Sequence, residues 1–452
     1  MLMTENLRKL GRVVRPGDRD WDAARGNPFN VLVDQRPEAI AFPADAREVA
    51  AVVADARRRG LRVAPQSTGH NAGPLGSLDD TLILNTSALT GVSIDAEARR
   101  VRVGTATRWQ DVTPRLSELG LAALHGSSPR VGIAGYSLGG GIGWLARKYG
   151  MQTNAVTAIE LVTAEGDLVR TDAAHEPELF WALRGGGGNF GVVTAIEFEV
   201  QPVRELYAGS LFFPIERTAE VLHAWAELLP ALPEEITSWA TVLHFPPLPE
   251  LPDAVRGRSF TVVMAAFLGG EADGRELLRP LRRLGAEMDS FAMQPPVGLS
   301  ELAMDPPDPL PFRSTHALVD ELPSAAIEDI AEIGGVGSAL TMVQLRHMGG
   351  ALARHEPGAG ARATLPGQVC MFGLGVVPAP AAEQIVRSEL DALAAATAPH
   401  SVGEYPNFIE DEADASGFFD PETWDRLRRA KALYDPEDLF RGNHHIPPAD
   451  RF

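Results

Sequence analysis

The sequence predicts an α+β protein made of two differently patterned parts. Helical and strand-like patterns are mixed along the whole chain, and long apolar strand-like runs begin only near Tyr207. Residues 126–143 form a third signal, because seven of these eighteen residues are glycine. Glycine permits positive φ and close backbone approach, so such a run indicates backbone N–H groups around an anion or a flat cofactor. We expect an irregular loop here, since a flexible linker would contain more serine and polar residues.

The first part, up to about residue 204, predicts short elements joined by glycine-rich loops. Residues 37–60 predict a strand and then a helix, because Val49, Val52, Val53 and Ala56 recur at helical spacing before Gly60. Short strands are expected at 61–65, 81–84, 99–104 and 191–200, a helix at 112–119, and a hairpin over 158–171. A second glycine run, 185–191, leads into the last of these strands.

The second part predicts an antiparallel sheet with helices on one face. Strand-like runs are expected at 207–214, 236–245, 259–268, 338–346 and 368–377, with helices at 217–232, 274–285 and 324–333. The proline-rich residues 295–312 predict a long loop, the kind of segment that often forms a lid or a site wall. Further helices are expected at 381–397 and 421–434.

Composition narrows the class of protein. The net charge of −19 argues against nucleic acid or an anionic membrane as a partner, since both require a basic surface. No apolar run reaches membrane-spanning length, and residues 1–19 lack the apolar core of a signal peptide, so we expect a cytoplasmic protein. Cys370 is the single cysteine, and no cluster of His, Asp or Glu at ligand spacing accompanies His444 and His445, so we expect no disulfide and no metal site. The oligomeric state stays open.

One dinucleotide-binding fingerprint can be tested directly. Gly141, Gly143 and Ala146 match the spacing G-x-G-x-x-A. No buried strand leads into this segment and no βαβ unit follows it, so a nicotinamide-type Rossmann site is disfavoured.

Four separated motifs instead resemble one known family. They are Gly69-His70-Asn71, the 126–143 run, residues 180–191 and the tail 434–448. Their order over nearly the whole chain resembles the berberine bridge enzyme-like group of flavoproteins, in the vanillyl-alcohol oxidase/PCMH-type FAD-binding superfamily. The resemblance implies a PCMH-type FAD-binding domain of residues 30–204, completed by the C-terminal segment 401–452. Residues 205–400 would form an inserted substrate-binding domain, and FAD would be the cofactor.

The resemblance also implies how FAD is attached. His70 matches the histidine that is bonded covalently to the flavin, and Ser128 stands where many members carry a second linking cysteine. A serine hydroxyl is a far poorer nucleophile than a thiolate, so we expect one covalent bond, through His70. The other residues expected around FAD are Gln66, Ser67, Thr68, Gly69, Asn71, Val131, Gly132, Gly135, Leu138, Gly139, Gly140, Gly141, Gly143, Gly188, Asn189, Gly191, Val192, Val193 and Asn443.

Tyr405 is the expected catalytic base, since it matches the first tyrosine of the family's Tyr-x-Asn-Tyr motif. A free phenol has a pKa near 10, so this role needs a lowered pKa or proton transfer concerted with hydride transfer. A packing role for Tyr405 is the alternative. Phe408 replaces the second tyrosine of the motif, and Ile142 stands where some bacterial oxidases have a catalytic tyrosine. Glu410 and Asp411 are the reserve candidates for the base.

Three residues are candidates for substrate contact. Strand alternation directs Gln344 and Arg346 to the same side, and Asn407 lies within the tyrosine motif.

The resemblance implies an FAD-dependent oxidase acting on a C–H next to a hydroxyl or amine of a small specialised metabolite or sugar. Hydride would pass to flavin N5 and O2 would be the electron acceptor. Val131 stands at the family's gatekeeper position and favours reactivity with O2. The alternatives are a dehydrogenase with another acceptor, or a flavin-holding cyclase or binding protein with no net redox change. The substrate cannot be chosen from the fold.

Overall fold

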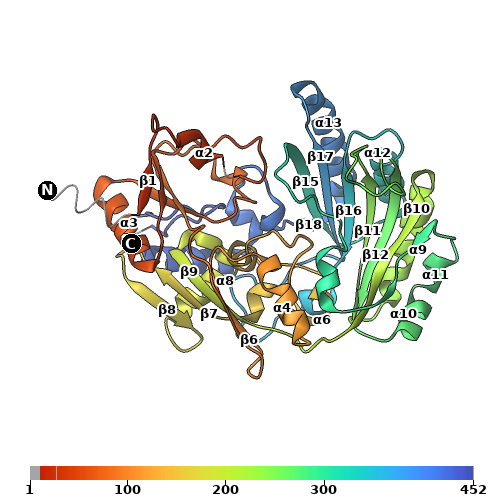
Figure 1. The fold of residues 1–452 in the computed structure, drawn as a ribbon, viewed down its shortest axis with the longest axis horizontal. Coiled ribbons are helices and arrows are strands. Elements are labelled where there is room, and N and C mark those ends of the chain that lie inside the picture. Colours follow the sequence, from red (N-terminus) through yellow and green to blue (C-terminus); the bar gives the residue numbers. More distant parts are fainter. Residues whose placement is uncertain (1–10, 27, 451–452) are drawn as a thin grey trace.

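Three sheets organise the chain, and they form two lobes (Figure 1). The computed structural model describes residues 11–26 and 28–450; the first ten of the residues used above to argue against a signal peptide lie outside this range. The mixed helix and sheet content confirms the predicted α+β class. The two smaller sheets draw their strands from residues 12–199, and the large sheet from residues 206–403. The domain boundaries near 204 and 400 stay predictions.

The first small sheet has the strand order β1–β2–β4–β3. Its strands are β1 (Arg12–Val14), β2 (Ala39–Phe42), β3 (Arg62–Gln66) and β4 (Thr81–Asn85), of which β2, β3 and β4 are parallel. Helix α3 (Ala46–Arg59) covers it and has both expected ends. The Asp45 carboxylate accepts hydrogen bonds from two backbone N–H groups of the first turn, and Gly60 closes the helix at φ 68°.

The second small sheet is antiparallel, with the order β5–β6–β9–β7–β8. Its strands are β5 (Val92–Asp95), β6 (Arg100–Gly104), β7 (Val156–Val162), β8 (Leu168–Asp172) and β9 (Val192–Glu199). The shorter helices of this lobe are α2 (Trp21–Arg25), α4 (Thr113–Glu118), α5 (Ile133–Leu138), α6 (Ala146–Tyr149), α7 (Gln152–Ala155) and α8 (Pro177–Gly186). Helix α14 (Pro421–Tyr434), from the C-terminal tail, packs on α8 in the same core. The tail therefore returns to the lobe in which the chain began.

The large sheet has nine antiparallel strands in the order β13–β10–β12–β11–β16–β17–β15–β18, with β14 pairing to β10. The strands are β10 (Leu206–Pro214), β11 (Ile236–His244), β12 (Ser259–Phe267), β13 (Met288–Asp289), β14 (Ala292–Gln294), β15 (Phe312–Val319), β16 (Met342–His347), β17 (Val369–Val376) and β18 (Ser401–Gly403).

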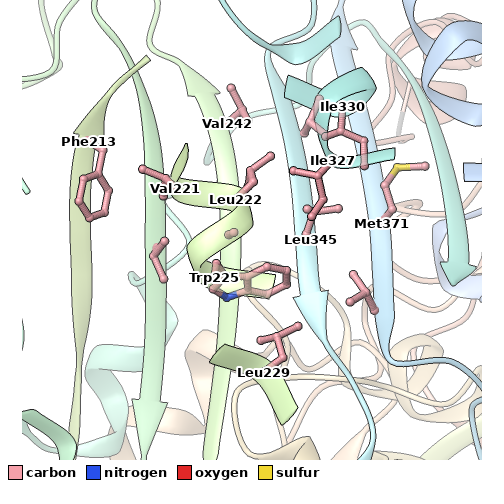
Figure 2. Packing of buried hydrophobic residues seen from close by; sticks show 14 of the residues in the cluster. Phe213, Val221, Leu222, Trp225, Leu229, Val242, Ile327, Ile330, Leu345 and Met371 are labelled. Carbon is pink, nitrogen blue, oxygen red and sulfur yellow. The ribbon is translucent and has the colours of Figure 1, made fainter. Parts of the chain in front are cut away.

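Helices cover one face of this sheet, as the sequence predicts (Figure 1). They are α9 (Thr218–Leu228), α10 (Glu271–Leu277), α11 (Arg279–Arg282), α12 (Ser324–Gly334) and α13 (Pro380–Thr397). Figure 2 shows Leu222 and Trp225 of α9 and Ile327 of α12 packed on the strands. Since strand side chains alternate, Leu345 points into this core while its neighbour Arg346 belongs to the opposite face. That opposite face is left for the functional site.

Three sequence expectations need correction. Residues 133–138 of the glycine run form helix α5, because the apolar side chains of Ile133 and Leu138 pack into the core and offset the low helix propensity of glycine. The helix expected at 274–285 is two short helices, α10 and α11, with Pro280 in the first turn of α11. Strand β15 lies where no strand was expected, because its polar half, Arg313 to His316, shows no apolar alternation.

Candidate active site

A cavity of about 410 Å³ lies between the two lobes. It is lined by the loop after β3, by both glycine runs, by strands of the large sheet and by the C-terminal tail. The predicted site residues on its lining are Gln66, Ser67, Thr68, Gly69, His70, Asn71, Ser128, Val131, Gly132, Gly135, Leu138, Gly139, Gly188, Asn189, Gly191, Val193, Arg346, Tyr405, Asn407 and Asn443. Segments far apart in the sequence thus meet at one cavity.

Two surfaces of the cavity differ in chemistry. The first, which we call the glycine wall, comprises Gly132, Gly135, Gly139, residues 185–188 and Gly191. The second, the sheet wall, is the uncovered face of the large sheet and comprises Leu243, Met342, Arg346, Phe372, Leu374 and Val376.

The glycine wall is suited to a flat cofactor. A methyl group on Gly135 or Gly188 would meet no protein atom within 4 Å, although both residues line the cavity. On Gly132 it would lie 3.3 Å from the Thr68 side chain, and on Gly139 it would overlap Asn407. The wall is therefore backbone that a bound group can approach closely, as the chemistry of FAD requires.

His70 is held as a neutral imidazole at the edge of the cavity. Its ring stacks on Phe29 with centroids 4.3 Å apart, and Nδ1 lies 2.9 Å from the Thr68 hydroxyl oxygen. Burial, and secondarily the charge of Arg108, lowers the pKa of His70 to about 4. Nε2 is buried and has no hydrogen-bond partner among residues 11–26 and 28–450. A neutral imidazole with one uncommitted nitrogen has the form needed for a covalent bond to a cofactor.

Tyr405 is the polar centre of the site. Its side chain is buried, and its hydroxyl oxygen accepts hydrogen bonds from the backbone N–H of Gly141 at 2.9 Å and of Ile142 at 3.2 Å. The Asn407 amide donates a third, at 3.0 Å. Three donors on one oxygen favour negative charge there. Burial nevertheless raises the pKa of Tyr405 to about 12, against the two backbone donors and the charge of Arg346, which lower it.

These contacts correct the expected role of several glycines. Gly140 and Gly141, at φ 133° and 84°, lie behind the lining, and their turn directs the Gly141 N–H at Tyr405. Gly143 is also off the lining, and a methyl group on it would collide with the His125 carbonyl. Val192 points into a hydrophobic core because it alternates with the cavity-lining Val193.

Arg346 dominates the sheet wall. Its guanidinium lies over the rings of Trp239, at 4.1 Å, and Phe408, at 4.7 Å. Its Nε donates to the Gln344 amide oxygen at 2.6 Å, and the Gln344 nitrogen donates to Thr241 at 3.2 Å. Gln344 shares the strand face of Arg346, as expected, but it is fully buried and does not line the cavity. It therefore positions Arg346 and does not itself contact the cavity.

The C-terminal tail is fastened to the glycine wall. Lys431 is fully buried, and its ammonium donates to the Asn189 carbonyl at 2.8 Å, the Phe440 carbonyl at 2.8 Å and the Asp435 carboxylate at 2.6 Å. The Asn189 amide donates in turn to the His444 carbonyl at 2.9 Å. We call this set of hydrogen bonds around Lys431, Asp435 and Asn189 the clasp. Next to the clasp, the Asn443 amide donates to the Asn71 carbonyl. The side chains of Asn189 and Asn443 thus hold segments together as well as lining the cavity.

Three further polar residues line the cavity, and only Glu410 among them was a candidate from the sequence. Tyr136, inside the glycine run, donates from its hydroxyl to the Leu124 carbonyl at 2.9 Å. Asp305 reaches the cavity from the proline-rich loop, and burial raises the pKa of its carboxyl. Glu410 lines the cavity, and burial raises its pKa to about 7, whereas the other reserve base, Asp411, is exposed and off the lining.

Arg362 is a further buried residue near the site that the sequence did not predict. It is buried behind Gly140 and Tyr405, and its guanidinium lies 4.7 Å from the Phe419 ring. Burial lowers its pKa to about 10. Nothing in the surrounding alanine- and glycine-rich sequence distinguishes it from a surface arginine.

Fold and cavity together define the class, a flavin-binding oxidoreductase, and the comparisons with known proteins agree. Residues 37–172 match the family model "FAD binding domain". The chain is 30% identical to (R)-6-hydroxynicotine oxidase of Paenarthrobacter nicotinovorans, covering 97% of each sequence. It is 26% identical to xylooligosaccharide oxidase of Thermothelomyces thermophilus, covering 94% of this chain and 90% of that protein. The chain therefore belongs to the FAD-linked oxidoreductases of the berberine bridge enzyme-like group.

Solved structures share this fold over the whole chain. The crystal structure of 6-hydroxy-D-nicotine oxidase from Arthrobacter nicotinovorans superposes with a TM-score of 0.83 at 27% identity, covering 97% of this chain and 98% of that one. Berberine bridge enzyme from Eschscholzia californica superposes with a TM-score of 0.84, at 19% identity and full coverage of both chains. The predicted family, fold and enzyme class are confirmed.

Two expected absences concern only the described part of the chain. Among residues 11–26 and 28–450, no helix is both long and apolar enough to cross a membrane. The same residues contain no group of three or more His, Cys, Asp or Glu side chains arranged for a metal ion.

Proposed function

We propose that this chain is an oxidase that uses FAD and O2 to oxidise a C–H bond next to a hydroxyl or amine of a small molecule. Two relatives, a 6-hydroxynicotine oxidase and a xylooligosaccharide oxidase, support both substrate classes. When bound, FAD supplies a two-electron acceptor that takes hydride at N5 and passes the electrons to O2, giving hydrogen peroxide. The glycine wall and His70 would hold it.

The observation that carries this proposal is the set of three donors on Tyr405. In the proposed reaction the phenolate form of Tyr405 removes the proton from the substrate hydroxyl or amine. The N–H groups of Gly141 and Ile142 and the Asn407 amide stabilise the charge on the tyrosine oxygen during that transfer. Because burial raises the pKa of Tyr405 to about 12, the phenolate is the minor form at neutral pH, so Tyr405 must first lose its own proton to solvent and the rate is expected to rise with pH.

We further propose a single covalent bond to FAD, through His70. The neutral imidazole and its uncommitted Nε2 support this role, and Ser128 on the lining offers only a weak nucleophile. Flavin should stay with the polypeptide after acid denaturation of the wild-type protein and be released from His70→Ala. His175→Ala, at an exposed histidine, is the matched control and should retain it. Flavin washing off the denatured wild type would contradict the proposal.

The use of O2 is tested separately from attachment. Val131, a small side chain on the lining, supports access of O2. The protein is mixed anaerobically with a set of alcohols and amines, and a substrate among them should bleach the flavin. Air should then restore the flavin colour at least as fast as the enzyme turns over. Slow recolouring in air with rapid recolouring by an artificial acceptor would indicate a dehydrogenase. Product formation without bleaching would indicate a scaffold with no net redox change.

A further inference from the structure

Arg346 is a buried cation that forms no ion pair with a side chain of residues 11–26 and 28–450. It is 6% exposed. Taking a guanidinium out of water without a counter-ion is costly, so such a group is retained where an anion or strong acceptor binds. Its position on the cavity lining identifies the side from which that partner arrives.

The surroundings leave one edge of the guanidinium available. Trp239 and Phe408 lie against the guanidinium, and Gln344 accepts from Nε. Among the described residues, the only hydrogen bond donated by the Arg346 side chain is the one from Nε, which leaves Nη1 and Nη2 available. The two N–H groups along that edge form a planar fork, a geometry that matches the two oxygens of a carboxylate better than a single hydroxyl.

The neighbourhood of the fork fits the rest of such a substrate. Phe408, which packs on Arg346, also meets the Tyr405 ring edge to face at 4.9 Å. A group held at Arg346 is therefore one aromatic ring away from the proposed base. Met342, Phe372 and Leu374 extend the sheet wall as an apolar surface beside the fork.

We propose that this cavity selects substrates bearing a carboxylate, which Arg346 binds through Nη1 and Nη2 while the apolar sheet wall contacts the carbon skeleton. The inference rests on the proposed function for the reaction that follows, but the binding step is independent of it. It assigns Gln344 and Trp239 a positioning role, because they fix the plane and edge of the guanidinium.

Asp305 is the competing partner for Arg346. It lines the same cavity, and the charge of each affects the pKa of the other, although they form no ion pair within 4.0 Å in the described chain. If a substrate carboxylate occupies the fork, the Asp305 carboxylate repels it. Asp305→Asn should therefore tighten carboxylate binding rather than weaken it.

The test uses the holoenzyme and probes that cannot be oxidised. Acetate, benzoate and 1-naphthoate are titrated against their neutral amides, with binding followed by calorimetry and by the flavin absorption band. We expect wild type to favour at least one carboxylate over its amide. Arg346→Gln should weaken that carboxylate about 10- to 100-fold and leave the amide unchanged. Arg346→Lys, which keeps the charge and loses the fork, should bind that carboxylate with an affinity between those of wild type and Arg346→Gln.

Arg354→Gln is the matched control, since Arg354 is exposed and paired with Glu234. Equal binding of each carboxylate and its amide, failure of every carboxylate to bind, or an unchanged preference in Arg346→Gln would each overturn the inference. Flavin content and melting temperature of each variant separate these outcomes from misfolding. If a neutral substrate bleaches the flavin and no carboxylate preference is found, the carboxylate site is wrong but the proposed oxidase function is not. If carboxylates are preferred and no substrate bleaches the flavin, the proposed oxidase function is wrong but the carboxylate site is not.

Discussion

The glycine wall and the sheet wall face the same cavity but are built in opposite ways. The glycine wall is backbone brought close by missing side chains, as at Gly135 and Gly188. The sheet wall is made of side chains from strands β11, β16 and β17, with Arg346 as its charged member. The first surface suits a cofactor common to the family, and the second can change with each substrate. Tyr405 lies where the two meet, and this division organises the following predictions.

The largest effect is expected where the walls meet. Tyr405→Phe removes the oxygen on which three donors converge, so kcat should fall about 10²- to 10⁴-fold, the range for loss of a general base. Flavin content should not change, because the ring still fills its site. Steady-state kinetics with any oxidised substrate measures this. Tyr434→Phe removes a hydroxyl that donates to Glu176 outside the cavity and should retain full activity; equal rates for both variants would assign Tyr405 a packing role.

The next effect concerns the clasp behind the glycine wall. Lys431→Met removes a fully buried ammonium and leaves the Asp435 carboxylate uncompensated, at a cost of about 3–5 kcal/mol of unfolding free energy. When unfolding is followed by tryptophan and flavin fluorescence, the midpoint should shift to a lower urea concentration. Lys148→Met breaks a partly exposed pair with Glu235 and should cost about 0–1 kcal/mol. Similar shifts for both variants would show that burial does not distinguish the two pairs.

Within the glycine wall itself, Gly188→Val should act on the cofactor and not on the fold. The new side chain meets no protein atom close to its Cβ and points into the cavity, so FAD content after purification should fall about tenfold or more. Circular dichroism should remain that of the wild type. Gly270→Val has the same open surroundings away from the cavity and provides the control. Full FAD content in Gly188→Val would place the cofactor elsewhere.

The smallest effect is a pH dependence at Glu410. Burial raises its folded-state pKa from 4.5 to about 7, so its contribution to stability is fully present below pH 4.5 and is lost as pH rises through 7. Glu410→Gln should therefore be more stable than wild type at pH 8 by about 1–2 kcal/mol, and the difference should vanish near pH 4.5. Melting temperatures across this range measure it. Glu118→Gln, at an exposed glutamate off the cavity lining, should follow the wild-type curve; a parallel change in both variants would rule out burial as the cause.

Much of the glycine wall could be predicted from the sequence. Glycine density, the motif around His70 and the tail motif are local signals, and the residues that carry them line one cavity. The errors lie where local patterns are incomplete. Gly140, Gly141 and Gly143 share the glycine signal but support Tyr405 or pack on the backbone, which their composition does not reveal. Strand β15 was missed because its polar half, Arg313 to His316, shows no apolar alternation; Arg313, for example, pairs with Glu383 of helix α13.

The sequence by itself determined the family, the α+β class and the backbone nature of the glycine wall, because these depend on residue type and order. The tertiary structure alone decided that the Arg346 guanidinium lies against the rings of Trp239 and Phe408 while Gln344 is fully buried off the cavity lining. It alone brought the N–H groups of Gly141 and Ile142 to the oxygen of Tyr405, more than 260 residues away. The physical reason is that strand register and the topology of the fold determine which distant side chains share a desolvated site, and a local sequence pattern encodes neither.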